Sequence, residues 1–222
     1  MNPVIDAIKT RRNVKHFVPK IVSWEKIAEV LDAARYAPSS GNLQNWKFIV
    51  VTDPAQKQAL AEAAHEQYDI TLAGALIVVC GEPEKAERYY GMRGERLFTV
   101  QNCAAAIQNM LLAAHSLNLG TAWIGVFDEE AVKNELDIPE KIRPQAIIAL
   151  GYVKEQPEIP AKYPLTTQVF FGKWGGAVKD IMRYLNVTSA VLHRKAEAVK
   201  DSVQTKKQFI VDKTKNLFKK KS

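Results

Sequence analysis

Two short segments near the N-terminus contain side chains suited to binding an anion and a polar ring. The first, residues 11–17, includes Arg11, Arg12 and Lys15, so it concentrates positive charge where a helix is predicted to end. Arg presents a planar fork of donors that fits a phosphate, and Arg11 and Lys15 are four residues apart, which keeps them close. The segment therefore favours an anionic ligand. A solvated helix end is the alternative, because basic side chains also suit the last turn of a helix.

The second segment, residues 38–46, reads PSSGNLQNW and leads into an apolar strand. Its two serines supply hydroxyls, and Asn42 and Gln44 each offer a donor and an acceptor. The edge of an isoalloxazine ring alternates carbonyls with ring nitrogens, so amide side chains would pair with it. Ordinary turn chemistry is the alternative for this loop. Together, the two segments indicate a ligand with a phosphate and a flat ring, such as flavin mononucleotide (FMN).

Length and composition indicate a soluble globular protein with one ordinary domain and an appendage. The chain has 222 residues, 47% hydrophobic and 25% charged, so it can bury a sizeable core. The longest strongly apolar run, residues 73–80, is too short to span a bilayer, and the first residues do not resemble a secretory signal. Cys80 and Cys103 lie in apolar segments and are predicted to be buried thiols in a reducing compartment. We therefore expect a cytoplasmic location.

The net charge of +7 is concentrated at the C-terminal end of the chain. Residues 179–222 contain 12 Lys and Arg against 4 Asp and Glu, a net charge of +8, which leaves 19 against 20, or −1, in residues 1–178. Apolar residues beyond Val178 also recur near a 3.5-residue spacing, as in a long amphipathic helix. We predict a body of residues 1–176 and a basic amphipathic helical tail of residues 177–222.

The basic tail suits an acidic membrane surface, a nucleic acid or an acidic protein partner. Its aromatic residues are few and are not interleaved with the basic ones, which disfavours nucleic acid. A peripheral membrane position or docking to a protein partner is the functional prediction for the tail. A solvated helix lying against the body is the alternative.

Local signals locate helices and strands along the body. Asn2-Pro3, Ser23 and Asp128 are predicted helix starts, and Asp53-Pro54 turns into a further helix over about residues 55–67. Apolar runs predict strands at residues 48–51, 75–80, 121–127 and 145–153. The longest helical pattern, residues 97–117, is rich in Ala and Leu and should be a central helix buried nearly all round. Strands mixed with helices around such a helix indicate an α+β or α/β sandwich.

The two N-terminal segments and two later ones resemble the FMN-dependent nitroreductase family. The matching motifs are RRNVKHF, PSSGNLQNW, the stretch AAAIQNMLLAAHSLNLGTAWIG that begins at Ala104, and Leu150-Gly151-Tyr152. The resemblance covers residues 3–176. It implies a nitroreductase-like α/β sandwich of the α+β class, with a central mixed or antiparallel sheet flanked by helices and a long buried central helix.

The resemblance also implies roles for individual residues. Arg11 would contact the FMN phosphate, with Arg12 and Asn13 beside it, and Lys15 would reach the pyrimidine edge of the ring. Backbone amides of Ile124 and Gly125 would face flavin N5 and O4. The remaining cofactor contacts would come from Pro38, Ser39, Ser40, Asn42 and Gln44, of which Pro38 to Ser40 belong to the opposite subunit, and from Lys162 as a late basic residue. Asn13 and Asn45 stand where the family usually has Ser and Pro.

By resemblance, the reaction is that of a homodimeric NAD(P)H oxidoreductase. NADH or NADPH delivers a hydride to flavin N5, and a small-molecule electron acceptor such as a quinone or nitroaromatic is then reduced. The flavin carries the chemistry, so no side chain is assigned as general acid or base. The alternatives are a relative on the same fold with another reaction (flavin destruction, reductive dehalogenation or azoline oxidation) and a flavin-binding regulatory protein that docks through its basic tail.

Other conspicuous side chains are assigned to structural roles. The histidines show no metal-ligand spacing, and His115 is predicted to be a satisfied interior residue. Trp46 and Trp123 lie in strand contexts, which favours core packing over ligand stacking. Residues 88–97 contain aromatic, basic and glycine residues and form a hypothetical lid over the flavin.

Overall fold

The chain divides into two compact units, Met1–Pro160 and Ala161–Ser222, and the computed structural model describes residues 2–176. The helices described in the first unit are α1 (Pro3–Thr10), α2 (Trp24–Arg35), α3 (Pro54–Ala63), α4 (Pro83–Arg93), α5 (Thr99–Ser116) and α6 (Glu129–Glu135). Its strands are β1 (Phe17–Val18), β2 (Trp46–Val51), β3 (Ala75–Gly81), β4 (Gly120–Ile124) and β5 (Arg143–Val153). In the second unit a 3-10 turn spans Leu165–Thr167. The helical tail predicted for residues 177–222 lies outside the described residues, and the boundary at 176 stays a prediction.

The five strands form one sheet in which every strand pairing is antiparallel. β3 lies between β2 and β5, and β5 pairs along its other edge with β4 and then with the two-residue β1. The long β5 thus holds three strands together. This confirms the predicted α+β class with an antiparallel central sheet.

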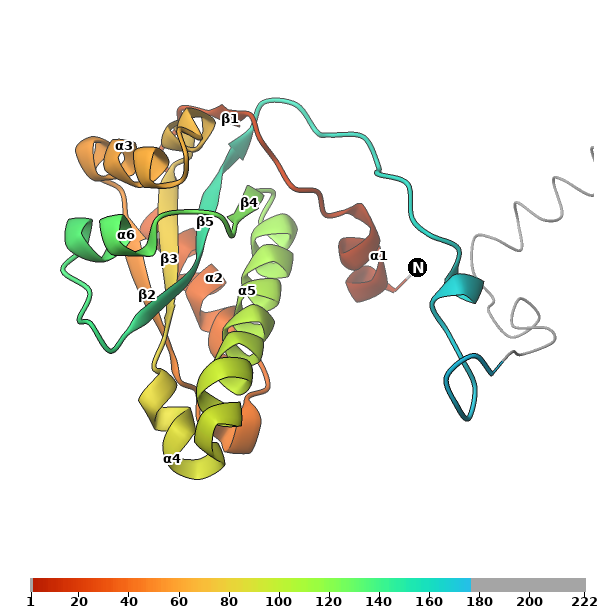
Figure 1. Ribbon diagram of the computed structural model, residues 1–222. Helices are drawn as coiled ribbons and strands as arrows, with labels where there is room; N and C mark the ends of the chain where they lie inside the picture. Colours follow the sequence, from red (N-terminus) through yellow and green to blue (C-terminus); the bar gives the residue numbers. More distant parts are fainter. Residues whose placement is uncertain (1, 177–222) are drawn as a thin grey trace, which may run out of the picture. The chain divides into compact units, whose positions relative to one another are not determined.

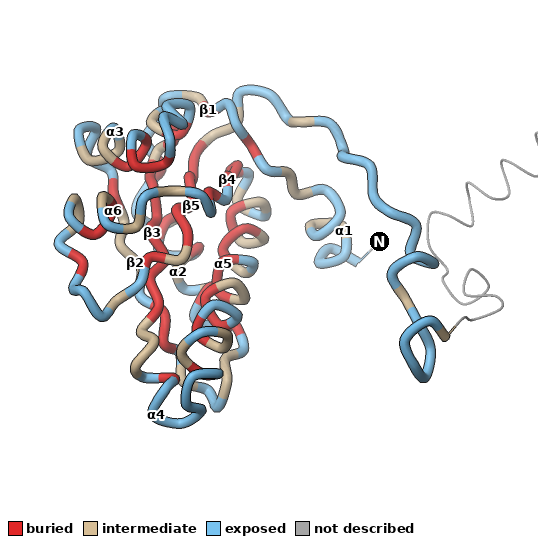
Figure 2. The backbone as a smooth tube through the Cα atoms, in the orientation of Figure 1, coloured by how far each residue is buried: buried red, intermediate tan, exposed pale blue. Residues whose placement is uncertain are grey.

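Helices cover both faces of the sheet (Figure 1). Side chains of β3 alternate between two hydrophobic clusters, and every residue of the strand is buried (Figure 2). Ile77 and Val79 face the cluster that contains residues of α2 and α5, whereas Leu76 and Val78 face the cluster that contains residues of α3 and α6. A continuous apolar run such as residues 75–80 is what a strand buried on both faces requires.

Helix starts follow the predicted capping chemistry. The side chains of Asn2, Asp53 and Asp128 each accept hydrogen bonds from two backbone amides of the first turn that follows. Ser23 precedes α2 as predicted, although its side chain makes no capping hydrogen bond. Helix ends agree less well with the predictions. α3 stops at Ala63, because His65 and Glu66 both adopt left-handed backbone angles with φ of 56° and 61°.

The long helix α5 packs one face on the sheet. Cys103, Ile107 and Met110 are buried, but Gln101 and Gln108 on the opposite face are exposed, so the prediction of burial nearly all round is wrong for a single chain. Among the described residues one helical stretch, Pro83–Ser116, is long and apolar enough to cross a membrane. Because the buried face of α5 belongs to the core, we assign this stretch to the interior of the fold.

Both cysteines are buried free thiols, as predicted. Burial raises the pKa of Cys80 and of Cys103 to about 12, so neither thiol forms a thiolate at neutral pH. Their place in the core makes them packing residues.

Candidate functional site

A cavity of about 470 Å³ opens where the N-terminal segment passes the outer edge of β4. Three stretches of chain line it, and two of them contain residues predicted from the sequence. The lining residues are Asn13, Val14 and Lys15; Ala122, Trp123 and Ile124; and Glu66, Gln67, Tyr68, Asp69 and Ile70. Asn13, Lys15 and Ile124 are thus brought together from segments more than a hundred residues apart.

The N-terminal segment is held against β4 by two hydrogen bonds. The amide of Val14 donates to the carbonyl of Thr121 at 2.9 Å, and Oδ1 of Asn13 accepts from the amide of Trp123 at 3.0 Å. An isolated parallel bridge between Asn13 and Thr121 results. Asn13 therefore builds the wall of the cavity, because its carbonyl oxygen is already paired with the backbone of β4.

Strand alternation separates the two amides predicted to face a flavin. Trp123 directs its amide outward to Asn13, so the amide of Ile124 is directed toward β5, where Ile124 pairs with Ile147. The next amide on the outward side is that of Gly125, just beyond the strand. It donates to no backbone or side-chain acceptor within the described part of the chain. Gly125 is therefore the better candidate for an amide donor at the cavity rim.

Trp123 lines the cavity and is 39% exposed. The prediction that it packs in the core is therefore wrong, whereas the same prediction for Trp46 is confirmed, since Trp46 is buried. Alternation along β4 explains the difference: Ala122 and Ile124 face the core, and Trp123 between them faces away.

The stretch 66–70 was missed as part of the site, because residues 55–67 were predicted to be helical. The left-handed pair His65 and Glu66 ends the helical path and turns the chain across the cavity. The signal in the sequence is the loss of apolar residues after Ala64, where five polar or aromatic residues follow. Glu66 and Asp69 bring two carboxylates to a cavity that also contains Lys15.

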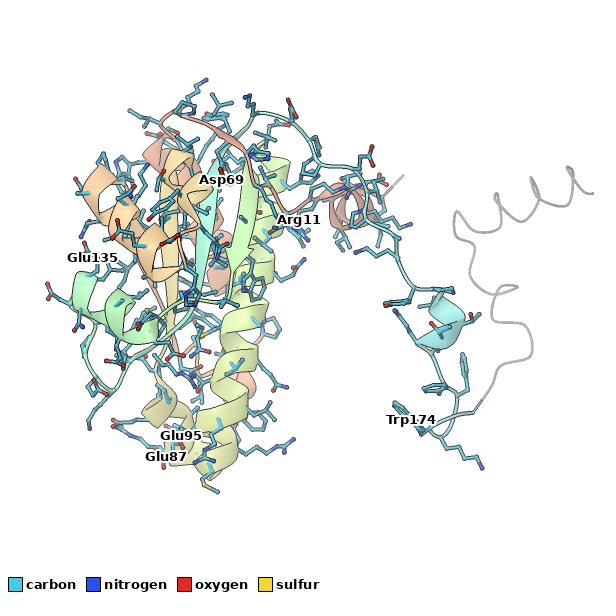
Figure 3. All side chains as sticks on the ribbon, turned by 45° about the horizontal axis from the view of Figure 1, so that its top comes forward. Arg11, Asp69, Glu87, Glu95, Glu135 and Trp174 are labelled. Atoms are coloured by element: carbon cyan, nitrogen blue, oxygen red, sulfur yellow. The ribbon has the colours of Figure 1, made fainter. Side chains whose placement is uncertain are left out.

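The two arginines that precede Asn13 differ in their surroundings. Nη1 of Arg12 donates to the carbonyls of Lys9 and Arg11, both at 2.8 Å, so it caps the end of α1. Arg11, labelled in Figure 3, makes no hydrogen bond or ion pair through its guanidinium with any residue that the structure describes. Burial, and then the charge of Arg12, lower the pKa of Arg11. A bound anion would stabilise the charged guanidinium against both its burial and the repulsion from Arg12, so Arg11 fits a phosphate ligand.

His115 lies close to the same arginines on the last turn of α5. Its Nε2 lies 2.8 Å from Oγ1 of Thr10, so this partly buried ring is satisfied, as predicted. Over residues 2–176, no cluster of His, Cys, Asp or Glu could hold a metal ion.

The predicted loop 38–46 does not line the cavity of its own chain. It leads into β2 at Trp46, which pairs with Gly81 at the far end of β3, whereas Ile124 is aligned through Ile147 with Val78 in the middle of that strand. Figure 3 shows the same separation, with Glu87 and Glu95 near the loop end of the sheet and Asp69 near the other end. Lys162 lies in the second unit and is exposed, so its role stays a prediction.

The loop itself has an unusual shape. Gly41, Asn42 and Gln44 all have left-handed backbone angles, with φ of 52°, 55° and 47°. Nε2 of Gln44 donates to Oδ1 of Asn42 at 3.0 Å, and the amide of Gln44 donates to Oγ of Ser39 at 3.0 Å. Asn42 and Gln44 remain exposed and can present amide groups to another molecule.

Comparison with known proteins gives a family-level match. The model described as the nitroreductase family matches residues 8–87 and 68–152. A protein of Archaeoglobus fulgidus, provisionally named NADH dehydrogenase/NAD(P)H nitroreductase, is 38% identical over 160 residues, which cover 70% of this chain and 88% of that protein. The 5,6-dimethylbenzimidazole synthase of Rhodospirillum rubrum is 30% identical over 182 residues, which cover 70% of this chain and 85% of that protein.

Solved structures show the same fold. A crystal structure from Parabacteroides distasonis, with the same provisional name as the Archaeoglobus protein, has a TM-score of 0.71 and 31% identity; the match covers 78% of this chain and 100% of that one. A protein of Clostridium difficile named FMN-dependent nitroreductase has a TM-score of 0.65 and 26% identity, and the match covers 76% of this chain and 99% of that one.

Proposed function

This chain belongs to the nitroreductase family, and we propose that it is an FMN-dependent NAD(P)H oxidoreductase. The observation that carries the proposal is the cavity at the edge of β4, which unites Asn13, Lys15 and Ile124. Arg11 precedes Asn13 by two residues, and its guanidinium has no hydrogen bond or ion pair with any residue that the structure describes. The name of the Clostridium difficile relative supports FMN as the cofactor.

FMN, when bound, would supply the centre that accepts a hydride from NADH or NADPH and passes the electrons to a small-molecule acceptor. The protein would hold, orient and shield it. Arg11 suits the phosphate, and Lys15 would place a positive charge near the ring. Gly125 offers an amide donor, and Asn13 holds β4 in place. No described side chain needs to act as general acid or base.

A homodimer is part of the proposal. α1 has no buried residue (Figure 2), and its apolar residues Val4, Ile5 and Ile8 are exposed. A helix of eight residues is too short to be stable alone, so a second copy that covers this face would stabilise it. The loop 38–46, which does not line its own cavity, could then reach the cavity of the opposite subunit with Pro38, Ser39 and Ser40.

Anaerobic reduction of the purified protein tests the cofactor and the reaction. We expect a yellow protein, or a colourless one that takes up FMN, which bleaches with NADH or NADPH and regains its colour with a quinone or a nitroaromatic. Failure to take up FMN under any condition would defeat the proposal. The same assay, run with each nicotinamide and a panel of acceptors, identifies the co-substrate and the acceptor class.

A second candidate is another flavin reaction on the same fold. The similarity to a 5,6-dimethylbenzimidazole synthase favours it, because the family includes reactions other than reduction of an external acceptor. If the flavin is reduced but no acceptor regenerates it, product analysis after aerobic incubation with reduced FMN decides between the two. A flavin-binding regulatory protein would be indicated by FMN uptake without reduction by either nicotinamide.

The basic tail would act separately from the cavity. Its net charge of +8 supports docking to an acidic membrane surface or an acidic protein partner from a cytoplasmic location. Co-sedimentation of the full chain with anionic vesicles at two salt concentrations tests the membrane alternative. Binding that is absent, or that does not change with salt, would count against electrostatic docking.

A further inference from the structure

Two buried asparagines lie behind the loop 38–46. Asn45, the residue before β2, is fully buried, and Asn102, in the first turn of α5, is 4% exposed. Nδ2 of Asn102 donates to Oδ1 of Asn45 at 2.7 Å. Nδ2 of Asn45 in turn donates to Oγ1 of Thr99 at 3.0 Å and to the carbonyl of Glu82 at 3.1 Å. The two amides are thus held in one orientation by partners on α5 and at the end of β3.

Asn102 reaches from this pair to the loop. Its Oδ1 accepts from the amide of Ser40 at 2.9 Å, and its Nδ2 donates to Oγ of the same serine at 3.0 Å. Both the backbone and the side chain of Ser40 are therefore fixed by one side chain. Because Asn45 already accepts from Nδ2 of Asn102, the Asn102 amide cannot flip without breaking these bonds.

The residues after Ser40 are in a strained shape. Gly41, Asn42 and Gln44 have left-handed angles, which cost free energy for residues other than glycine and persist only where the surroundings impose them. The hydrogen bonds that Gln44 makes to Ser39 and Asn42 are exposed to water. The hydrogen bonds of Asn102 to Ser40 are partly buried and the one to Asn45 is buried, so water competes least with this connection.

The burial of two amide side chains at this position costs free energy, so it calls for an explanation. An apolar side chain would fill the same space without the cost of removing an amide from water, whereas a fully satisfied polar network specifies one arrangement. Among the buried side chains of the described residues, Asn45, Thr99 and Asn102 form one connected polar group, and that group leads to Ser40.

We propose that Asn102, locked by Asn45, is a positioning residue that sets Ser40 and the loop 41–44 before any ligand arrives. The inference rests on the proposed function for what the loop binds, namely FMN in the cavity of the opposite subunit. Substitution of Asn102 leaves the exposed side chains of the loop intact but removes the hydrogen bonds that hold the loop in one conformation. FMN binding must then order the loop, and the entropy lost in doing so weakens the affinity.

The test compares Asn102→Ala with Asn109→Ala in the full-length protein. Asn109 is a matched control, because it lies on the same helix, is partly buried, and donates to the carbonyl of Ala33 in α2 at 3.1 Å rather than to the loop. Both variants should lower Tm. Only Asn102→Ala should weaken FMN binding to the apoprotein, by about tenfold, while Asn109→Ala stays within about twofold of the wild type.

Amide hydrogen exchange of the apoprotein supplies a readout without FMN. The amide of Ser40 donates to Asn102, and the amides of Asn42, Leu43 and Gln44 donate to acceptors within the loop. They should exchange faster in Asn102→Ala and at the wild-type rate in Asn109→Ala. If Asn102→Ala does not fold, Asn102→Ser, whose hydroxyl is too short to span the gap to Ser40, should give the same result.

The outcomes separate the two proposals. A wild-type protein that never binds FMN defeats the proposed function, while the exchange experiment still tests whether Asn102 sets the loop. Unchanged exchange of loop amides in the Asn102 variants overturns the inference. Equal FMN affinities for Asn102→Ala and Asn109→Ala overturn it as well, even if the oxidoreductase activity is established.

Discussion

At the scale of residues, the cavity depends on one side chain that joins the start of the chain to β4. Oδ1 of Asn13 spans to the amide of Trp123 at 3.0 Å. The sequence indicated that Asn13 was a departure from the motif. It could not indicate the partner, because that partner lies 110 residues later and is fixed only by the pairing of β4 with β5.

Charges that line the cavity should set the reduction potential of a bound flavin. Lys15→Met removes a positive charge and should lower the two-electron potential by about 20–40 mV, which corresponds to about 1–2 kcal/mol of lost stabilisation of the anionic reduced ring. Asp69→Asn removes a negative charge from the same cavity and should raise it. Potentials measured by dye equilibration check both changes.

Lys20→Met is the control for this prediction. Lys20 lies over the ring of Tyr152, 4.5 Å from its centroid, and does not line the cavity. Its substitution should leave the potential unchanged. A shift equal to that of Lys15→Met would mean that general surface charge, rather than the cavity, sets the potential.

Acid should destabilise the protein partly through His115. Burial lowers the pKa of this imidazole below 6.5, and the charges of Arg11 and Arg12 lower it further. The unfolded chain therefore takes up the proton first as the pH falls. The stability that neutral His115 contributes is complete above the unfolded pKa of 6.5 and is lost as the pH falls through the lower folded pKa.

Unfolding temperatures measured across this pH range check the prediction. His115→Gln keeps a polar group near Thr10 but does not titrate, so its Tm should fall less steeply than that of the wild type below pH 6.5. A fall as steep as in the wild type would assign the acid sensitivity to other groups.

At the scale of elements, α4 closes over the loop that Asn102 holds from behind. Gly41 lies directly under the hydroxyl of Tyr90, and the Tyr90 ring packs edge-on against Phe98 with centroids 5.2 Å apart. The stretch 88–97, predicted to be a flexible lid, is helical over most of its length and ends in a π-helical turn at Gly94–Phe98. Whether it covers a bound flavin stays a prediction.

Gly41→Ala should show how closely α4 and the loop are coupled. The new methyl group would collide with the Tyr90 hydroxyl and would force alanine into a left-handed angle, which costs about 1–2 kcal/mol. Tyr90→Phe removes only the colliding oxygen, so the double variant should be more stable than the sum of the single changes predicts. Urea unfolding of the four proteins measures this coupling, and strict additivity would contradict the contact.

Elements that depend on neighbouring residues were predictable, and those that depend on distant ones were not. Asn2, Asp53 and Asp128 cap helices through amides two or three residues away, so their identity and spacing suffice. The two-residue β1 has no local signal, since it exists only through its pairing with Tyr152 and Val153. The end of α3 is set by the left-handed pair His65 and Glu66, and the Ala-rich pattern before that pair led to a predicted helix that continues to residue 67.

At the scale of the whole molecule, each proposed site would need two chains. The cavity and the loop 38–46 are parts of one chain but lie at different positions along its sheet. Family resemblance named residues in both parts, and the structure brings Asn13, Lys15 and Ile124 together. The sequence alone does not determine which of the remaining residues meet, because in the proposed dimer that depends on how the two chains pack.

Mixed dimers should reveal whether the two parts work across the subunit boundary. One subunit carries Arg11→Ala with Lys15→Ala, and the other carries Ser39→Ala with Ser40→Ala. If the loop serves the opposite cavity, one site combines both defects and the other has none. Such dimers should bind about half the wild-type amount of FMN with wild-type affinity.

Two homodimers serve as controls, each with the same pair of substitutions in both subunits. Both homodimers should bind FMN weakly at every site. If the loop serves the cavity of its own chain, every site in the mixed dimer carries one defect. Flavin titration would then find no site of wild-type affinity, and the shared-site arrangement would be disproved.

The bridge between Asn13 and β4 also bears on when the protein can acquire a cofactor. During synthesis, the N-terminal segment leaves the ribosome long before Thr121 and Trp123 exist to receive it, and β4 in turn needs β5 behind it. The wall of the cavity therefore closes among the last events of folding, at the cost of ordering a loop of more than a hundred residues. Until that closure the chain would have no place to hold a flavin. Loading would therefore follow the pairing of the N-terminal segment with β4.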